Sequence, residues 1–184
     1  MNRDEWMREA LEANTPDLLR YFLRRTHHDD AADLVHDVVL VAWRRRHEAP
    51  RETVALRMWL YGVARRTLAA AHRATLRRSD LVGRVGHNLA ADHDTGPDQE
   101  TRLFVQEMLD ALPPRQREIV LLVHWDGFTL VEAARMLKVT PSTARTHYQR
   151  ARAFLREVLV DESDEAQPPE PSTALASAGA TGQP

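Results

Sequence analysis

Hydrophobic positions recur along most of this chain with the spacing of an α-helix, about 3.6 residues per turn. The clearest apolar face follows Asp29 and consists of Leu34, Val35, Val38, Val39, Ala42 and Trp43. No stretch shows the sustained alternation of apolar and polar residues that is typical of a half-buried β-strand. The pattern therefore predicts an all-α fold.

Residues 1–78 are predicted to form one small helical domain. Thr15-Pro16 indicates a helix start after a short N-terminal helix, because threonine can cap a helix and proline suits its first position. The helix that follows Asp29 ends before Pro50, since proline disfavours helix in the residue preceding it. A third helix carries an apolar face made of Leu56, Trp59, Leu60, Val63, Ala64 and Leu68. We expect the tryptophans on these faces to belong to the core.

Two segments lack the helical pattern. Residues 79–97 contain three glycines and several Asp and Asn residues, which predicts a flexible linker. Residues 161–184 are rich in Pro, Ala, Ser and acidic side chains and contain no Lys or Arg, which predicts a disordered acidic tail. We therefore expect two small helical domains, 1–78 and 98–160, joined by the linker and followed by the tail.

The second domain contains a series of helix start and stop signals. Asp98 starts a helix, "LPPRQRE" ends it and begins the next one, and "DGF" predicts a tight turn. Thr129 and Glu132 have the spacing of a capping box in front of a short helix. Thr140-Pro141 repeats the combination of a capping residue and a proline, and so begins the last helix.

The last two helices, Thr129–Leu137 and Thr140–Leu159, have the layout of a helix-turn-helix. Ala133 and Ala134 are small where the two helices would cross. One face of the second helix is rich in hydrogen-bond donors: Ser142, Thr143, Arg145, Thr146, Gln149 and Arg150. Arginine can pair with guanine and glutamine with adenine in the major groove. The pattern therefore predicts a DNA-recognition helix.

Charge is distributed unevenly along the 184 residues, although the net charge is only -2. Basic residues outnumber acidic ones from Arg20 to Arg78 and again from Arg135 to Glu157, and almost all of them are arginine. Two basic blocks predict an anionic partner, and arginine suits contacts with phosphate and guanine. Ordinary charged helix surfaces would give the same balance, so charge alone leaves both interpretations open.

Several classes of function are disfavoured. The chain has no cysteine, which excludes disulfides, thiolate zinc sites and a cysteine nucleophile. His27, His28 and Asp29 are adjacent rather than four residues apart, so we expect no metal site there. The sequence contains no phosphate-binding glycine loop or hydrolase motif, and its charged N-terminus is not a signal peptide. We expect a cytoplasmic protein that is not an enzyme, has no cofactor or metal, and makes no membrane contact of its own.

Three segments resemble bacterial RNA polymerase sigma factors. "DDAADLVHDVVLVAWRRR" and "RMWLYGVARRTLAAAHR" are similar to consecutive helices of sigma region two. "ALPPRQREIVLLVHWDGFTLVEAARMLKVTPSTARTHYQRARAFLREVL" is similar to region four. These motifs occur in the order of the family and cover about residues 10–160. The chain resembles the small extracytoplasmic-function (ECF) sigma factors, which keep only regions two and four.

The resemblance implies a promoter-specificity subunit that recognises two DNA elements. The loop His47–Arg57 matches the family's loop that captures a flipped base of the minus-ten element. The candidate phosphate contacts in this region are Arg51, Arg57, Arg65 and Arg66. The candidate contacts with the minus-thirty-five element are Ser142, Thr143, Arg145, Thr146, His147, Gln149 and Arg150. The chain departs from the family at Arg66, where Asn is common, and at His147, where Arg is common.

The resemblance also implies protein partners. Region two of such proteins docks on the clamp helices of the RNA polymerase beta-prime subunit, and the matching residues here are Asp33, Leu34, His36 and Asp37. His36-Asp37 stands where the family usually has Gln-Glu. Region four usually meets the beta flap of core RNA polymerase. An anti-sigma factor that covers both regions is a further candidate partner.

A free-standing helix-turn-helix transcriptional regulator is the alternative function. Such a protein binds a palindrome as a dimer and needs a sensor or dimerisation domain. The N-terminal half of this chain has a basic helix face and no predicted strands, so it does not resemble a receiver domain. The two functions differ in whether promoter binding requires RNA polymerase.

Overall fold

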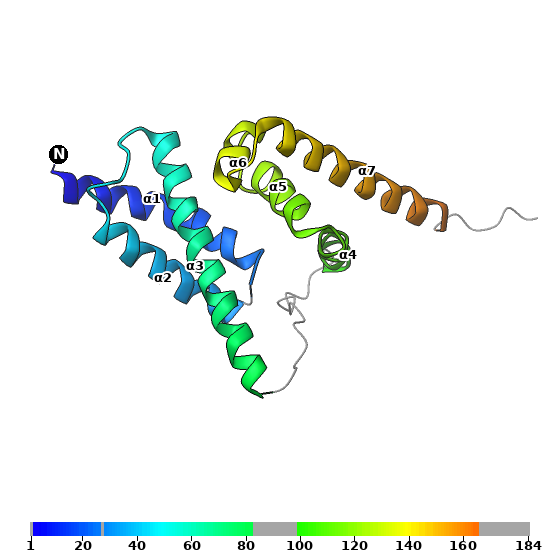
Figure 1. The fold of residues 1–184 in the computed structure, drawn as a ribbon, viewed down its shortest axis with the longest axis horizontal. Helices are drawn as coiled ribbons and strands as arrows, with labels where there is room; N and C mark the ends of the chain where they lie inside the picture. The colour runs from blue at the N-terminus through cyan, green and yellow to red at the C-terminus, as the bar shows by residue number, and fades with distance from the viewer. Residues whose placement is uncertain (1, 27, 83–98, 166–184) are drawn as a thin grey trace, which may run out of the picture.

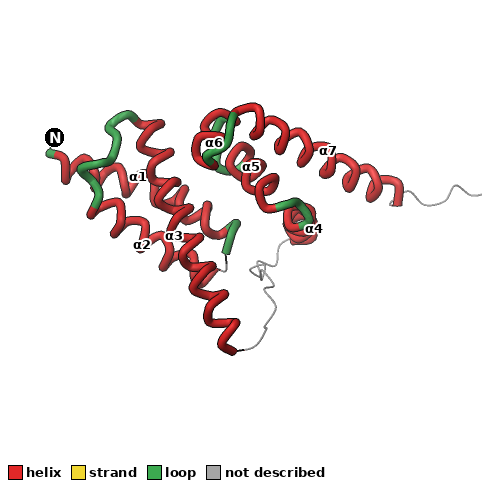
Figure 2. The backbone as a smooth tube through the Cα atoms, in the orientation of Figure 1, coloured by secondary structure: helices red, strands yellow, loops and turns green. Residues whose placement is uncertain are grey.

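The computed structural model describes residues 2–26, 28–82 and 99–165, and every regular element in these ranges is a helix (Figure 1, Figure 2). In chain order the helices are α1 (Arg3–Leu23), α2 (His28–Arg44), α3 (Thr53–Val82), α4 (Gln99–Asp110), α5 (Pro114–His124), α6 (Leu130–Leu137) and α7 (Pro141–Glu165). The all-α prediction is confirmed. Most of the predicted linker and tail lies outside the described residues.

Two helices run beyond their predicted ends. Helix α3 continues to Val82, although the sequence predicted an end near residue 78, and α7 continues to Glu165 rather than ending near 160. Gly83 is the first strong helix-breaking residue after the predicted end of α3, and Pro168 is the first after that of α7. The change in composition comes before these helix-breaking residues, so the two helix ends expected from composition were too early.

Helix α1 is continuous, and the predicted helix start at Thr15-Pro16 is wrong. Pro16 lies inside the helix. Instead of capping a new helix, the Thr15 hydroxyl donates a hydrogen bond to the carbonyl oxygen of Leu11 at 2.8 Å. Leu11 and Leu18, on either side of the proline, are both buried. Packing along the whole length of α1 therefore outweighs the backbone hydrogen bond that proline cannot make.

The helices form an N-terminal group, α1–α3, and a C-terminal group, α4–α7 (Figure 1). Each group has a cluster of buried residues of its own. The N-terminal cluster consists of Met7, Leu11, Ala42, Ala49, Leu56 and Leu60, and the C-terminal cluster of Leu112, Val120 and Ala151. Trp43 and Trp59 are partly buried and pack against the N-terminal cluster, in agreement with their predicted place in the core.

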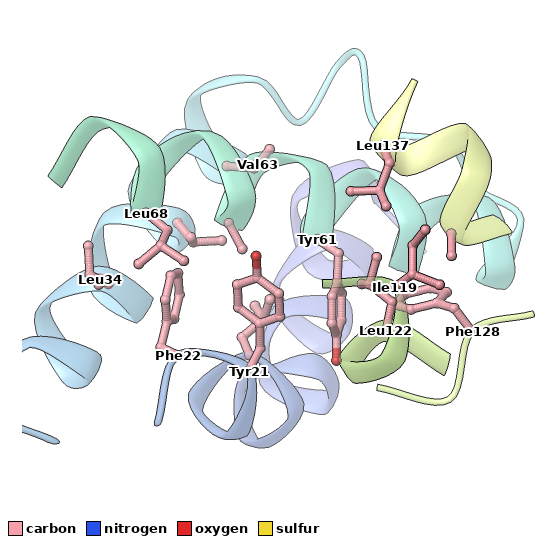
Figure 3. Packing of buried hydrophobic residues seen from close by; sticks show 14 of the residues in the cluster. Tyr21, Phe22, Leu34, Tyr61, Val63, Leu68, Ile119, Leu122, Phe128 and Leu137 are labelled. Carbon is pink, nitrogen blue, oxygen red and sulfur yellow. The ribbon is translucent and has the colours of Figure 1, made fainter. Parts of the chain in front are cut away.

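The largest core cluster draws on both groups and joins them (Figure 3). An edge-to-face series of aromatic rings crosses the boundary between the groups. The ring centroids of Tyr21 and Tyr61 are 5.3 Å apart, and those of Tyr61 and Phe128 are 4.8 Å apart. Ile119, Leu122 and Leu137 of the C-terminal group complete this core. The two groups are thus packed together, whereas the sequence predicted only that a linker connects them.

None of the helices in the described ranges is both long enough and apolar enough to cross a membrane.

Candidate nucleic-acid interface

Helices α6 and α7 form a helix-turn-helix whose ends are fixed by capping interactions. The Thr129 hydroxyl accepts a hydrogen bond from the backbone N–H of Glu132, and the Glu132 carboxylate accepts one from the backbone N–H of Thr129 at 2.7 Å. This confirms the predicted capping box. At the start of α7, the Thr140 hydroxyl accepts from the backbone N–H of Thr143 at 3.1 Å. The second predicted cap is also confirmed.

Small residues allow α6 and α7 to cross closely. Ala133 and Ala134 of α6 and Ala144 of α7 are fully buried. Lys138, at the C-terminal end of α6, has φ 55° and donates its backbone N–H to the carbonyls of Ala134 and Arg135. This left-handed residue turns the chain sharply into α7.

The opposite face of α7 is exposed and rich in donors. The exposed residues are Ser142, Thr143, Arg145, Thr146, Gln149 and Arg150. The short hydroxyl side chains form hydrogen bonds within the first turns of α7. The Thr146 hydroxyl donates to the carbonyl of Ser142 at 3.1 Å. The hydroxyls of Ser142 and Thr143 each lie 2.8 Å from the Thr140 hydroxyl. Arg145, Gln149 and Arg150 are therefore the longest donors on this face.

His147 differs from its neighbours on α7. Its side chain is only partly exposed, and its ring Nδ1 is buried without a hydrogen-bond partner in the described structure. Next to it, Tyr148 stacks on His124 of α5, with ring centroids 5.7 Å apart and a hydroxyl-to-Nε2 distance of 2.8 Å. This part of α7 faces the supporting helix more than the solvent.

The predicted minus-ten arginines are divided between two environments. Arg51 and Arg66 are exposed. Arg57 and Arg65, in contrast, are partly buried and bind the C-terminal group. The Arg65 guanidinium donates to the carbonyl oxygen of Met136 at 2.8 Å. The four arginines therefore do not form one exposed surface in this arrangement.

The loop between α2 and α3 is held in place by α1. Arg3 donates three hydrogen bonds to carbonyl oxygens of this loop, to Arg46 at 2.9 Å, His47 at 2.8 Å and Ala49 at 3.1 Å. Arg46 in turn donates to the Asp4 carboxylate at 2.6 Å. Sequence reasoning did not single out Arg3, because a lone arginine in a charged N-terminal helix carries no local signal.

The structure brings together four charged residues that sequence reasoning missed, which we name the Asp126 cluster: Arg24, Arg25, Glu118 and Asp126. Arg25 donates to the Asp126 carboxylate at 2.7 Å and to the Glu118 carboxylate at 3.0 Å, and Arg24 donates to Asp126 at 3.2 Å. Among the described residues, Arg25 and Asp126 are the buried charged side chains, 8% and 2% exposed. The cluster joins the residues that follow α1 to α5 and to the loop after it.

Burial is the largest influence on the pKa of the Asp126 carboxyl. It raises the pKa of the Asp126 carboxyl above the usual value, and the positive charges of Arg25 and Arg24 oppose the increase. Desolvating a carboxylate is unfavourable unless a cation and hydrogen bonds compensate for the lost water. Arg24 and Arg25, which directly follow α1, are therefore needed to hold this charge inside the molecule.

The predicted polymerase-binding residues lie on α2. Asp33, His36 and Asp37 are exposed, whereas Leu34 is 6% exposed and belongs to the shared core. An effect of Leu34 on polymerase binding would therefore be indirect. Among the described side chains, no three His, Asp or Glu residues are grouped so that they could hold a metal ion. His27 and the side chains of His28 and Asp29 lie outside the described part of the chain.

Comparison with known protein families finds a match for each of the two helix groups. The family described as Sigma-70 region 2 matches residues 10–78, and the family described as Sigma-70, region 4 matches residues 104–155. The first match covers the N-terminal group, and the second covers the helix-turn-helix and the helices that support it.

Curated relatives give the same assignment over most of the chain. The ECF RNA polymerase sigma factor SigD of Mycobacterium tuberculosis (strain H37Rv) is 30% identical over 172 residues, which cover 86% of this chain and 79% of that protein. The ECF RNA polymerase sigma factor SigM of the same strain is 32% identical over 137 residues, which cover 71% of this chain and 65% of SigM.

Two solved structures have a similar fold. The sigma factor RpoE from Bartonella quintana, in complex with the anti-sigma factor NepR, has a TM-score of 0.63 and 25% identity, with coverage of 82% of this chain and 91% of RpoE. CnrH, in complex with the cytosolic domain of CnrY, has a TM-score of 0.61 and 18% identity, with coverage of 90% of this chain and 100% of CnrH.

Proposed function

This chain belongs to the extracytoplasmic-function family of RNA polymerase sigma factors, and we propose which of its surfaces recognise the promoter and the polymerase. As a sigma factor it is a non-enzymatic subunit that directs RNA polymerase to promoters. The N-terminal group is its region two and the C-terminal group contains its region four. The observation that carries the proposal is the exposed, donor-rich face of α7 in a helix-turn-helix whose two helix starts are capped.

For the minus-thirty-five element, we propose recognition by Arg145, Gln149 and Arg150. These side chains are exposed on the outer face of α7 and are long enough to reach base edges in the major groove. Ser142, Thr143 and Thr146 are exposed beside them near the start of the helix, and their hydroxyl groups would have to exchange their hydrogen bonds within the helix for contacts with phosphates. His147 would act mainly by supporting the helix, because it is only partly exposed.

For the minus-ten element, we propose that the loop between α2 and α3 receives a flipped base and that Arg51, Arg57, Arg65 and Arg66 bind the strand. Taking a base out of the stack costs a few kcal/mol, which a preformed pocket and phosphate contacts must offset. The hydrogen bonds from Arg3 to the loop support this role, because they fix the loop backbone before DNA arrives.

For the protein partners, we propose that Asp33, His36 and Asp37 on α2 meet the beta-prime clamp helices of core polymerase, and that region four meets the beta flap. The exposure of all three α2 side chains supports the first contact. We also propose an anti-sigma partner, since RpoE was solved in complex with the anti-sigma factor NepR. We propose that the protein works in the cytoplasm, together with polymerase and DNA.

Run-off transcription tests this function. Purified core polymerase is supplied with the protein and a fragmented library of the host's own DNA, and new start sites are mapped. We expect discrete start sites that share two upstream elements. An Arg145→Ala substitution should weaken use of these promoters by about 1–3 kcal/mol and relax the preference at one minus-thirty-five position. Glu157→Ala, on the same helix, is the matched control. No polymerase binding, with tight binding to a palindrome, would instead support a free-standing regulator.

A further inference from the structure

A cavity of about 360 Å³ lies where α1, α3 and α5 meet, and we name it the three-helix cavity. Its wall includes Tyr21 of α1, Arg65 and Leu68 of α3, and Arg115 and Glu118 of α5. The volume is in the range of pockets that hold small molecules. None of the described residues that line the cavity belongs to α7, so it is separate from the proposed recognition face.

Two arginines of this wall, Arg65 and Arg115, bind backbone carbonyls at the C-terminal end of α6. Arg65 donates to the carbonyl oxygen of Met136 at 2.8 Å. Arg115 donates to the carbonyl oxygen of Leu137 at 3.3 Å. Among the described residues neither arginine is paired with a carboxylate, and each guanidinium has further N–H donors. The wall therefore holds two guanidinium groups that can bind an anion.

The start of α5 adds to the positive potential of the cavity. Pro114 and Arg115, the first two residues of α5, line the cavity, and no side-chain hydrogen bond caps this end of the helix. The N-terminal end of an α-helix carries a partial positive charge and unpaired backbone N–H groups, which attract phosphate and other anions. The helix start and the two arginines therefore favour the same kind of ligand.

Three polar atoms of the wall are buried without a hydrogen-bond partner in the described ranges. They are the Tyr21 hydroxyl, Nε of Arg117 and Oε1 of Glu118. The Tyr21 side chain is fully buried, and a buried polar group that lacks a partner is unfavourable. The hydroxyl and the Nε–H can donate to an anion, whereas the carboxylate oxygen needs a donor. A ligand that satisfies all three atoms must be anionic and must also carry a donor.

These groups are held in place by contacts outside the cavity. The Arg117 guanidinium forms a salt bridge with Asp110 at 2.8 Å, and the other carboxylate oxygen of Glu118 accepts from Arg25 at 3.0 Å. Burial, together with the negative charge of Glu118, raises the pKa of the Tyr21 hydroxyl above its ordinary value of 10.0. The hydroxyl therefore keeps its proton at neutral pH and is available as a donor.

We propose that the three-helix cavity binds a small phosphate ester whose organic part carries a hydrogen-bond donor. Arg65, Arg115 and the Tyr21 hydroxyl bind the phosphate, and the organic part donates to Oε1 of Glu118. A doubly charged phosphate suits two unpaired guanidinium groups better than a single carboxylate does. Nucleotides and polyol phosphates share this chemistry. Apart from Arg65, these residues are not among the proposed promoter contacts.

Isothermal titration calorimetry of the full-length protein at physiological salt tests the site. The probes are guanosine monophosphate, glycerol phosphate and inorganic phosphate, with guanosine and glycerol as the unphosphorylated controls. We expect one bound molecule per chain for at least one of the two esters, with an affinity at least about tenfold higher than that of inorganic phosphate. The ester that binds identifies the source of the ligand. Guanosine and glycerol should not bind.

Tyr21→Phe tests the site without changing its charge. The substitution should lower the affinity for the bound ester about three- to tenfold, because one hydrogen bond to the ligand is lost. The melting temperature of the free protein should stay the same or rise, since the hydroxyl has no described partner to lose. A hydroxyl with a purely structural role would instead lower the melting temperature and leave the affinity unchanged.

Arg115→Gln tests the charge of the wall and should lower the affinity at least about tenfold. Arg135→Gln is the matched control, because Arg135 is exposed on α6 and does not line the cavity. If Arg115→Gln fails to fold, as judged by circular dichroism, Tyr21→Phe still decides the question. Equal losses in the two arginine variants would mean that overall charge alone attracts the phosphate, and would overturn the proposal.

Two further results would overturn the proposed site. Equal affinity for all three phosphates would mean that the arginines attract any anion, and failure of both esters to bind at millimolar concentration would mean that the cavity holds only water. None of these measurements involves polymerase or promoter DNA. A negative result therefore leaves the proposed promoter function untouched, and a failure of that function leaves the cavity's ligand binding untouched.

Discussion

At the scale of single residues, the helix-turn-helix depends on two left-handed backbone positions. Gly127, before α6, has φ 68°, and Lys138, after α6, has φ 55°. A left-handed conformation costs a residue with a Cβ roughly 1–2 kcal/mol relative to glycine. Glycine at position 127 therefore suits its left-handed conformation, whereas lysine at position 138 is strained in it.

Substitutions at these two positions should have opposite effects on stability. Gly127→Ala should lower the free energy of unfolding by about 1 kcal/mol. Lys138→Gly should raise it by about 0.5–1 kcal/mol, because relief of strain exceeds the added entropy of the unfolded chain. Urea titration followed by circular dichroism measures both changes. Two effects of the same sign would contradict this account of the turns.

The same two residues show what local sequence can predict. The motif "DGF" predicted a tight turn at Gly127, because glycine marks positions that other residues avoid. Lys138 has no such mark, since lysine is common in regular helices, and its left-handed conformation follows from the crossing of α6 and α7. Asp126 was likewise taken as part of the turn, although its side chain binds arginines about one hundred residues away.

At the scale of elements, helix ends with local side-chain signals were predicted correctly, while helix continuity was not. The capping box of Thr129 and Glu132 needs only residues three positions apart, so the sequence contains all of its information. Pro16 also gave a local signal, but burial of Leu11 and Leu18 against the neighbouring helices overrode it. Contacts between distant segments decide such cases, and a single sequence does not show them.

The capping box should make stability depend on pH. Hydrogen bonds from Thr129 lower the pKa of Glu132 below its ordinary value of 4.5. A lowered pKa in the folded protein means that this contribution is present above pH 4.5 and is lost as the pH falls through the lowered pKa. The stability difference between the parent and Glu132→Gln should therefore shrink as the pH falls from neutral through the lowered pKa of Glu132. A difference that stays constant over this range would contradict the assignment.

The other half of the box can be tested at neutral pH. Thr129→Ala removes the hydroxyl that accepts from the Glu132 backbone, and should lower the free energy of unfolding by about 1 kcal/mol. Thr129→Ser keeps the hydroxyl and is the control. Equal losses for the two substitutions, measured by urea titration, would argue against a capping role.

Pro16 offers a stabilising substitution within α1. Pro16→Ala restores an N–H to the helix and removes the contact between the proline ring and the preceding turn, so it should raise the free energy of unfolding by about 1–3 kcal/mol. Ala13→Gly, at an exposed position of the same helix, should lower it by about 1 kcal/mol and shows that the helix is sensitive to propensity. Destabilisation by Pro16→Ala would indicate that the proline has a role in packing.

At the scale of the whole molecule, the two halves of the sigma factor share one core and one buried ion cluster. Tyr61 and Phe128 join the halves through apolar contact, and Arg25 joins them through Asp126 and Glu118. The sequence predicted the two halves and their order, because each half has its own helical pattern and family motifs. It could not predict their packing, since no local pattern pairs a residue of α1 with one in the loop after α5.

The central claim is that the free protein holds its two promoter-binding groups together through one shared core and the Asp126 cluster. The most direct test is the distance between spin labels at Glu12→Cys and Glu157→Cys, measured by pulsed electron paramagnetic resonance in the parent protein, in Asp126→Ala and in Asp110→Ala, whose salt bridge to Arg117 stays within the C-terminal group. We predict one short distance distribution for the parent and for Asp110→Ala, and a shift to longer or broader distances for Asp126→Ala. The same distribution in all three proteins would contradict the account.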